Sequence, residues 1–464
     1  MSKFYWIFIL IVSSSGLLMS QSSILRLEEF IKEVKNFHPI IQRSDLINKS
    51  ASVNALSAKA KFDPNVYFEN DFKSIDGKNY YSYQNYGLNI NTRSPVTIKA
   101  GHDNASGEFT NPEYTIGGIT YFGISVPLLN GFAMDERRAA LQQAKLITKQ
   151  SALASQVMIN NLLLDAHLAY YRWATSYLSY NLLNEFAAAA LERLKLTRIS
   201  QLNGDRSAAD TVEAAMQFQY FQIQLQELKM EFVNETIGLS SFLWTSNGQG
   251  YLLDDTYIPD TMLFQKKEFL NGEIAAPDPI IRNPEIIQYD LKLASLEVER
   301  KLKKQYLLPK LDLKVSALSR NSNLFGVLDG YQLEDNFKTG IDFSYPIFTR
   351  HAKAELEANK IKTENLQLDQ KEKIREYTLK LQRFQSEYSV LSRQLSEVNK
   401  VVQNASALLE YENFKFRQGE STIFLINNRE TKAIEARLKE LAFLEKMLIT
   451  TSKIKWISGE WINE

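Results

Sequence analysis

The sequence predicts an α+β membrane protein built as an internal tandem repeat, in which long helical hairpins follow groups of amphipathic strands. Three observations lead to this prediction: very long stretches without helix-breaking residues, strands with one apolar face, and an apolar leader at the N-terminus. Each half of the 464-residue chain repeats the same order of helix, strands, long helix, glycine turn and returning helix.

The second half contains the clearest long helix, which we expect from about residue 351 to residue 417. Gly419 is the only glycine between Gly340 and Gly459, and no proline follows Pro346. Since glycine and proline both disfavour the interior of a helix, this composition predicts two helices that meet at Gly419. At 1.5 Å per residue the first helix is on the order of 100 Å long. Its apolar residues alternate spacings of three and four, the pattern of a coiled-coil seam: Ile374, Tyr377, Leu381, Phe384, Tyr388, Leu391, Leu395, Val398, Val402, Ala405 and Leu409.

The rare helix breakers recur at matching places in the first half. Pro39 and Pro64 have counterparts in Pro284 and Pro309 at one constant offset, and identical residues lie between them. The isolated glycine Gly204 likewise corresponds to the turn glycine of the second half. A duplication explains these matches. The predicted boundaries are a first repeat over 21–245 with strands in 64–127 and a hairpin turning at 204, a linker over 246–279, and a second repeat over 280–464 with strands in 309–346 and a hairpin turning at 419.

The first twenty residues have the pattern of a secretory signal peptide. Lys3 precedes an apolar run from Phe4 to Val12 that continues through residues 16–19, and Ser20 is small enough for a cleavage site. We therefore expect Gln21 to begin the mature chain; a membrane anchor or a buried helix is the alternative. The chain contains no cysteine, which excludes disulfides, thiol catalysis, cysteine-bound metals and a lipid-modified N-terminal cysteine.

The strand segments alternate apolar and polar residues. Such alternation fits a half-buried sheet in a soluble sandwich, but strands of roughly 9–11 residues with apolar residues outward are also the pattern of outer-membrane barrels. The signal peptide favours the second interpretation. The predicted lipid-facing residues are Phe122, Ile124, Val126, Leu313, Val315, Ile341 and Phe343. Each half shows two clear strands, so one chain supplies four, which is too few to close a barrel, and several chains must share one.

The strand region of the first half is longer than that of the second. The surplus, within residues 75–114, contains Tyr86, Leu88 and Ile90 alternating with asparagines, followed by Val96 and Ile98. Two interpretations are open: an extracellular hairpin that caps the pore, or an additional pair of barrel strands. We favour the hairpin.

Taken in order, these features resemble the TolC family of outer-membrane efflux proteins over essentially the whole mature chain. Three stretches carry the resemblance best: the helix opened by Asn283 and Pro284, the strand ends at Pro127 and Pro346, and the turns around the two isolated glycines. The resemblance implies a homotrimer with a shared twelve-stranded transmembrane β-barrel, continued by a periplasmic α-helical coiled-coil barrel. It also implies partners: a periplasmic adaptor (membrane fusion) protein and an inner-membrane pump of the RND or ABC type.

The resemblance further implies a closable tip at the two turns. Charged residues near a narrowing ring can pair across chains and hold a tunnel shut, although solvated turn charges are the alternative. The predicted gate residues are Arg206, Asp210, Glu213, Phe416, Arg417 and Glu420. The predicted turn and adaptor-docking residues are Leu202, Gly204, Ser207, Gly419 and Thr422. Acidic residues often follow the turn glycine in this family, but the second half has Leu425 and Asn428 there.

Composition excludes several function classes. Positive and negative charges balance at net zero, so nucleic-acid binding has no support. No catalytic arrangement or nucleotide fingerprint appears, the four histidines lack ligand spacing, and we expect no enzyme, metal or cofactor. The predicted function is passive conduction across the outer membrane of a Gram-negative bacterium, in a tripartite efflux or type I secretion system. A structural coiled-coil surface protein and a secreted enzyme are the alternatives. The cargo stays open between drugs, metal ions and proteins.

Overall fold

The computed structural model describes residues 23–110, 115–254, 256–264, 280, 282–320 and 336–462. The predicted signal peptide therefore lies outside the described residues. The chain divides into two compact units, one helical and one that contains the sheet. The helical unit comprises the described parts of Met1–Ile41, Asn161–Ile274 and Gln382–Trp456, and the sheet unit comprises those of Gln42–Asn160, Ala275–Leu381 and Ile457–Glu464.

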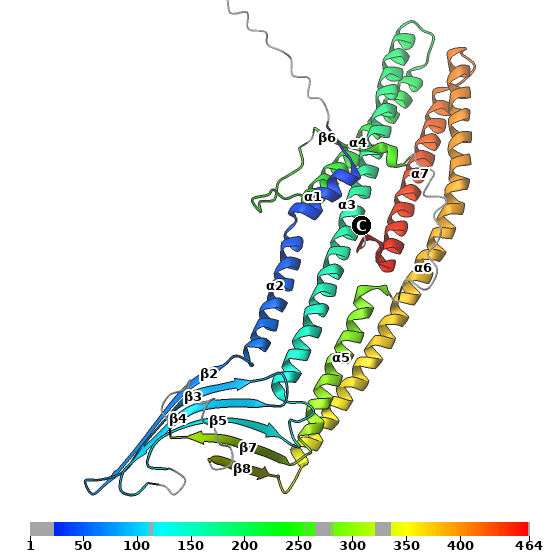
Figure 1. The fold of residues 1–464 in the computed structure, drawn as a ribbon. Helices are drawn as coiled ribbons and strands as arrows, with labels where there is room; N and C mark the ends of the chain where they lie inside the picture. Colours follow the sequence, from blue (N-terminus) through cyan, green and yellow to red (C-terminus); the bar gives the residue numbers. More distant parts are fainter. Residues whose placement is uncertain are drawn as a thin grey trace, which may run out of the picture. The chain divides into compact units, whose positions relative to one another are not determined.

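Four long helices form two hairpins, as predicted (Figure 1). Their bounds are α3 Glu136–Leu202, α4 Ala208–Ser240, α6 Arg350–Arg417 and α7 Ile423–Ser458. Gly204 and Gly419 make the two turns with φ of +81° and +79°, a left-handed backbone that explains why glycine stands at both positions. No described helix is both long enough and apolar enough to cross a membrane.

Three shorter helices precede the strands: α1 Leu27–Phe37, α2 Pro39–Ala60 and α5 Pro284–Gln305. The sequence of the first half, which has no glycine between residues 25 and 60, predicts a single helix over about residues 25–60. That prediction is wrong, because the chain breaks between α1 and α2. His38 has an extended backbone with ψ of 135°. Pro39 lacks an amide hydrogen and disfavours helical geometry in the residue before it, so the helix restarts there. The segments repeat in the predicted order, whereas the repeat boundaries remain predictions.

Most of the heptad seam of α6 is buried, as predicted, while Ile374, Phe384, Ala405 and Leu409 are half-buried. Tyr377 and Leu381 are each 3% exposed, and the seam positions Leu391, Leu395 and Val398 are equally well covered. In the helical unit, a further core surrounds Tyr170 and Trp173. Their polar atoms are satisfied: the Tyr170 hydroxyl donates to the Leu25 carbonyl at 2.7 Å, and the Trp173 indole donates to Thr236 Oγ1 at 3.0 Å. Small parallel strands, β1 Ser23–Leu25 and β6 Tyr257–Pro259, close this core.

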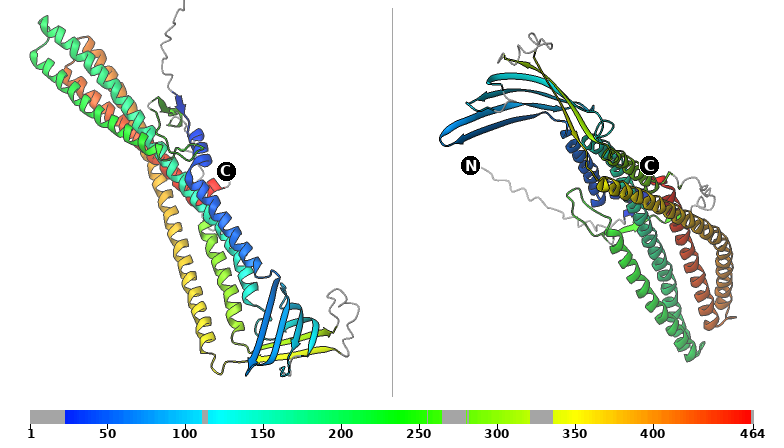
Figure 2. Two further views of the ribbon diagram at one scale, coloured as in Figure 1. Left: turned by 90° about the vertical axis from the view of Figure 1, so that its left-hand side faces the viewer. Right: turned by 90° about the horizontal axis from the view of Figure 1, so that it is seen from below.

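The sheet unit contains one antiparallel sheet of six strands, in the order β2-β3-β4-β5-β7-β8 (Figure 2). The strands are β2 Asn65–Ile75, β3 Lys78–Asn91, β4 Thr97–Ser106, β5 Gly117–Pro127, β7 Lys310–Ser319 and β8 Phe337–Ser344. The favoured extracellular hairpin within residues 75–114 is therefore wrong, as is the count of four strands. The surplus residues form β3 and β4, which lie in the sheet between β2 and β5.

The tight connection between β3 and β4 explains this arrangement. Thr92 closes the turn, since its hydroxyl donates to the Val96 carbonyl at 2.7 Å and its amide donates to the same oxygen at 3.1 Å. Pro95 occupies the turn, where its missing amide hydrogen costs no ladder bond. Both strands then pair with both neighbours over most of their length, because each continues the alternation of apolar and polar residues that its neighbours have.

Candidate functional site

The sheet has one apolar face, and the register places all the predicted lipid-facing residues on it. Directly paired residues of antiparallel strands share a face; Val126 pairs with Leu313, which pairs with Ile341. The same face holds Phe122, Ile124, Val126, Leu313, Val315, Ile341 and Phe343. Ile341 and Phe343 are open in the single chain, at 69% and 67% exposed, whereas Val126, Leu313 and Val315 are half-buried. Facing lipid remains a prediction.

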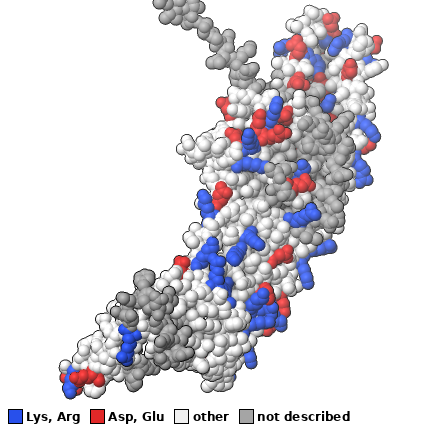
Figure 3. All heavy atoms as spheres, in the orientation of Figure 1, with Lys and Arg blue, Asp and Glu red and all other residues white. Residues whose placement is uncertain are grey.

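The two additional strands extend this apolar face. Ile124 of β5 pairs with Ile98 of β4, and Ile98 pairs with Ile90 of β3. On β2 the same face carries Val66, Phe68 and Phe72. Few charged side chains appear over the strands in Figure 3, whereas many appear over the helices. An uncharged face of this extent needs an apolar partner, because large exposed apolar patches mark contact with lipid or protein.

The opposite face of the sheet is polar. The Lys314 ammonium on β7 pairs with the Asp342 carboxylate on β8, and the Tyr83 hydroxyl on β3 donates to Asp103 Oδ1 on β4 at 3.0 Å. All the charged side chains on the regularly paired stretches of the sheet lie on this face: Glu69, Asp71, Lys73, Lys99, Asp103, Lys310, Asp312, Lys314, Lys338 and Asp342. One face of the sheet is thus apolar and the other is charged. A sheet that separates an apolar environment from water requires this division.

A row of two tyrosines and two glycines crosses the polar face. Tyr67, Gly87, Gly101 and Tyr121 are direct partners along β2, β3, β4 and β5. The two tyrosines reach over the glycines, and their hydroxyls are hydrogen bonded to each other. A Cβ atom on Gly87 would lie 2.7 Å from the Tyr67 hydroxyl oxygen, and one on Gly101 would lie 2.5 Å from that of Tyr121. The row therefore requires glycine at both central positions.

Two carboxylates, Glu136 of α3 and Glu355 of α6, contact the C-terminal end of α5. The Tyr306 hydroxyl donates to Glu136 Oε1 at 2.8 Å, and the Lys303 ammonium pairs with Glu355. Burial and then the Glu136 contact raise the pKa of Tyr306 to about 12. The hydrogen bond from Lys303 and its positive charge lower the pKa of Glu355. Both contacts lie at the start of a helix that follows a strand, so they hold each helix next to the sheet.

The structure divides the predicted gate residues among different contacts. The Arg206 guanidinium lies 4.7 Å from the centre of the Phe416 ring, so these two residues connect the turns. Asp210 forms a capping box with Ser207 at the start of α4. Glu213 Oε1 accepts a hydrogen bond from Asn427 Nδ2 at 3.4 Å. Within the described chain, neither carboxylate pairs with Arg206 or Arg417, and pairing between chains remains a prediction.

The remaining predicted tip residues lie at the turns themselves. Leu202 is 86% exposed, which leaves it available to a partner. The Thr422 hydroxyl accepts from the Leu425 amide at 3.3 Å and thereby caps the start of α7. Glu420 is exposed beside Gly419. Adaptor docking at these positions stays a prediction.

The sequence reasoning missed a buried ion pair next to the turns. Glu430 of α7 is 3% exposed, and both its carboxylate oxygens accept hydrogen bonds from the Arg193 guanidinium of α3. Arg193 also donates to Asn427 Oδ1 at 3.0 Å. A signal for this site is present in the sequence. Glu430 occupies an apolar position of α7, four residues after the buried Ile426 and four before the buried Ile434.

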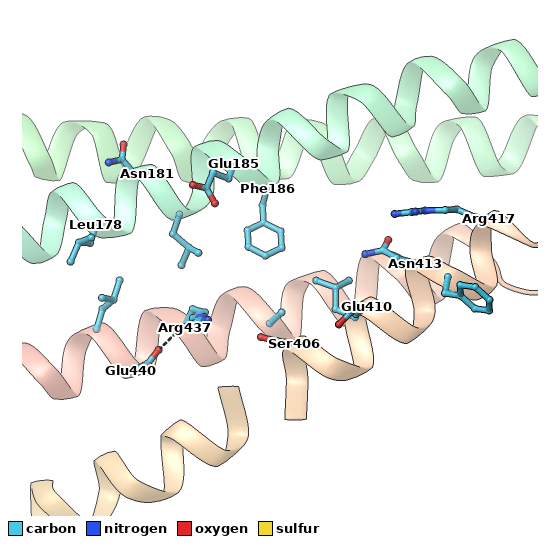
Figure 4. Close-up of a pocket in the computed structure, with 15 residues that line it drawn as sticks. Leu178, Asn181, Glu185, Phe186, Ser406, Glu410, Asn413, Arg417, Arg437 and Glu440 are labelled. Atoms are coloured by element: carbon cyan, nitrogen blue, oxygen red, sulfur yellow. Dashed lines mark hydrogen bonds and ion pairs between the residues drawn. The ribbon is translucent and has the colours of Figure 1, made fainter. Parts of the chain in front are cut away.

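A groove of about 730 Å³ lies between α3, α6 and α7 in the helical unit. Figure 4 shows Arg417 extending from α6 into the groove, and Arg437 paired with Glu440 along α7. Glu185 of α3 and Glu410 of α6 also line the groove. Arg417 thus belongs to a charged groove within one chain, in addition to its predicted place at the tip.

Comparison with known proteins gives matches at the level of structure. No protein-family model and no curated protein sequence matches the chain. The solved structure of CusC, described for its conformational changes in transmembrane channel formation, has a TM-score of 0.65 at 11% identity and covers 93% of this chain and 91% of its own. The outer membrane protein VceC of Vibrio cholerae has a TM-score of 0.64 at 11% identity, covering 93% and 96%.

A third similar structure is the open state of the MtrE outer membrane channel of Neisseria gonorrhoeae, with a TM-score of 0.64 at 12% identity over 94% of this chain and 89% of its own. At this identity the likeness is one of fold. It extends over nearly the whole length of every chain compared and includes the long helical hairpins together with the antiparallel sheet. The chain therefore has the TolC-like fold of outer-membrane channels, as its sequence resemblance predicts.

Proposed function

We propose that this protein is the outer-membrane component of an export system and passively conducts substrates from the periplasm, or from an inner-membrane pump, to the exterior. The observation that carries the proposal is the sheet itself, with an apolar face free of charge and an opposite face that holds the charged side chains. A membrane channel wall needs this division, because lipid excludes charge and a water-filled pore accepts it.

The proposal includes a homotrimer. A single open sheet leaves the amide and carbonyl groups of its two edge strands unpaired, which is costly in lipid. Closure therefore requires further copies of the chain. The proposed partners at the helical tips are a periplasmic adaptor protein and an inner-membrane pump of the RND or ABC type, by similarity to the family.

The alternative is a structural surface protein without transport activity. Long helical hairpins suit such a role equally well, but that role gives no reason for a sheet with one apolar face and one charged face. The charged face therefore favours the channel.

The test is fractionation followed by conductance. We expect the protein in the outer-membrane fraction as a trimer that resists detergent until it is heated, and we expect the purified trimer to form ion-conducting channels in a planar bilayer. A soluble periplasmic monomer would overturn the proposal. A heat-modifiable trimer that never conducts, even after the tips are opened by mutation, would favour the structural alternative.

Opening of the tips is expected in the double variant Arg206→Ser, Arg417→Ser. If these arginines bridge carboxylates of neighbouring chains, their loss leaves repelling acidic groups at the narrowest point and shifts the population towards the open state. Single-channel conductance in a planar bilayer should rise. Arg375→Ser, at an exposed position of α6 away from the turns, is the control and should leave conductance unchanged. An intact trimer with wild-type conductance in the double variant would remove both arginines from the gate.

A further inference from the structure

The strands β3 and β4 are built into the sheet as permanent members. They pair with their neighbours over most of their length, and Tyr67 and Tyr121 meet across them. This contact requires glycine at both intervening positions, Gly87 on β3 and Gly101 on β4. The row of four residues would have no reason to exist if β3 and β4 lay outside the sheet.

The two edges of the sheet fit each other. Because six strands alternate in direction, β8 runs antiparallel to β2, so β8 of one copy can pair with β2 of the next. The faces must also match, which requires the odd-numbered residues of β8 to lie beside the even-numbered residues of β2. Aligning the two strand ends that adjoin helices, Ser344 with Asn65, meets this condition.

This register places complementary residues opposite each other at most steps; on the charged face Asp342 lies opposite Tyr67, and Glu69 lies opposite Gly340. On the apolar face it pairs Phe343 with Val66, Ile341 with Phe68, Thr339 with Asn70, and Phe337 with Phe72. Thr339 and Asn70, the polar residues of the aligned stretches on this face, thus lie opposite each other. On the charged face it places the Lys338 ammonium opposite the Asp71 carboxylate. Opposite charges and apolar pairs across strands both stabilise such a contact.

We infer that each copy contributes six strands to a shared ring, closed by pairing of β8 with β2 of the next copy, and that the pore wall has eighteen strands in place of the twelve implied by the resemblance. The inference rests on the proposed trimer, since three copies of a six-stranded sheet make eighteen. Barrel diameter rises roughly linearly with strand number, so the ring is roughly half again as wide as a twelve-stranded one, in the range of open aqueous channels.

The position of β3 is tested by labelling single cysteines in a chain that has no native cysteine. Leu88→Cys and Asn89→Cys are neighbours on β3 that lie on the apolar and the charged face. In trimers in outer-membrane vesicles, a hydrophilic maleimide should label position 89 and leave position 88 unlabelled. Ile124→Cys on β5 is the reference, because the proposed channel places it in lipid whatever the position of β3.

The outcomes separate the inference from the proposed function. Protection at 124 and 88 with labelling at 89 supports the eighteen-stranded ring. Protection at 124 with full labelling at both 88 and 89 would place β3 outside the membrane and overturn the inference alone. Labelling at 124 would overturn the proposed function and the inference with it.

The closing contact is tested by cross-linking. With Asp71→Cys and Lys338→Cys in one chain, mild oxidation or a short thiol cross-linker should join copies covalently, up to a trimer on a denaturing gel. Asn70→Cys with Lys338→Cys is the matched control: these side chains lie on opposite faces in the inferred register and should not join. Failure of the first pair to join intact trimers, or equal joining of both pairs, would overturn the inferred closure.

Discussion

Replacing Arg193 by Met is expected to lower the free energy of unfolding by about 3–5 kcal/mol, because it leaves the Glu430 carboxylate buried without a partner. Arg193 lies on α3 and Glu430 on α7, with side chains 11% and 4% exposed. Glu430→Leu should cost a similar amount, since it leaves the guanidinium buried. The measurement is unfolding of the detergent-solubilised protein in urea, monitored by tryptophan fluorescence, and the quantity compared is the urea concentration at the midpoint.

The double variant Arg193→Met, Glu430→Leu distinguishes this prediction from a simple loss of packing. Removing both charges abolishes the unpaired group, and apolar replacements of similar volume are often neutral or stabilising. The double variant should therefore recover most of the stability lost in either single variant. If the losses in unfolding free energy of the two single variants add, so that the double variant is less stable than either, a desolvated ion pair at this site is contradicted.

Replacing Ile124 by Lys is expected to lower the amount of trimer in the outer membrane, the second large effect that we predict. Ile124 lies on the apolar face near the middle of the paired stretch of β5, between Ile98 and Val315. A lysine facing lipid near the bilayer midplane costs about 2–4 kcal/mol, so the amount of heat-modifiable trimer in the outer membrane should fall sharply. Phe343 pairs with Leu311 near the end of the sheet. A lysine there should cost less, since the cost falls to about 0–1 kcal/mol near the interface.

Ser125→Lys is the matched control for Ile124→Lys. Ser125 is the next residue along β5 and lies on the charged face, opposite Lys314. Two lysines directly opposite each other repel, but such cross-strand terms amount to about 0.2–1 kcal/mol. Trimer levels should therefore stay close to wild type. Equal losses at positions 124 and 125 would mean that the two faces are wrongly assigned.

The long helices were predictable because their signals are local and repeated. A 68-residue stretch without an interior glycine or proline admits few alternatives to the helix α6. The seam burial of Leu391 and Leu395 follows directly from heptad spacing. The isolated glycines Gly204 and Gly419 marked the turns, since only a left-handed residue reverses the chain so sharply.

The strand count was less predictable, because alternation defines a strand but not its neighbours. Leu88 and Ile90 read equally well as part of a protruding hairpin or of the sheet, and the resemblance favoured four strands per chain. Only the neighbours in space distinguish a protruding hairpin from two strands of the sheet: Gly87 pairs with Tyr67, and Gly101 pairs with Tyr121. The ion pair of Arg193 and Glu430 was missed for a related reason. Its two members are far apart in the sequence and do not occupy corresponding places in the two repeats.

The turn between β3 and β4 has a consequence for how such walls change over evolutionary time. The chain enters the sheet after α2 and leaves it into α3, so the number of strands between these helices must be even for both to lie on the same side. One additional strand would place α3 at the opposite end of the strands from α2. An additional hairpin such as β3–β4 leaves both helices at the same end. In the proposed trimer the pore wall can therefore widen only in steps: each hairpin that the gene acquires adds two strands per chain and six to the ring.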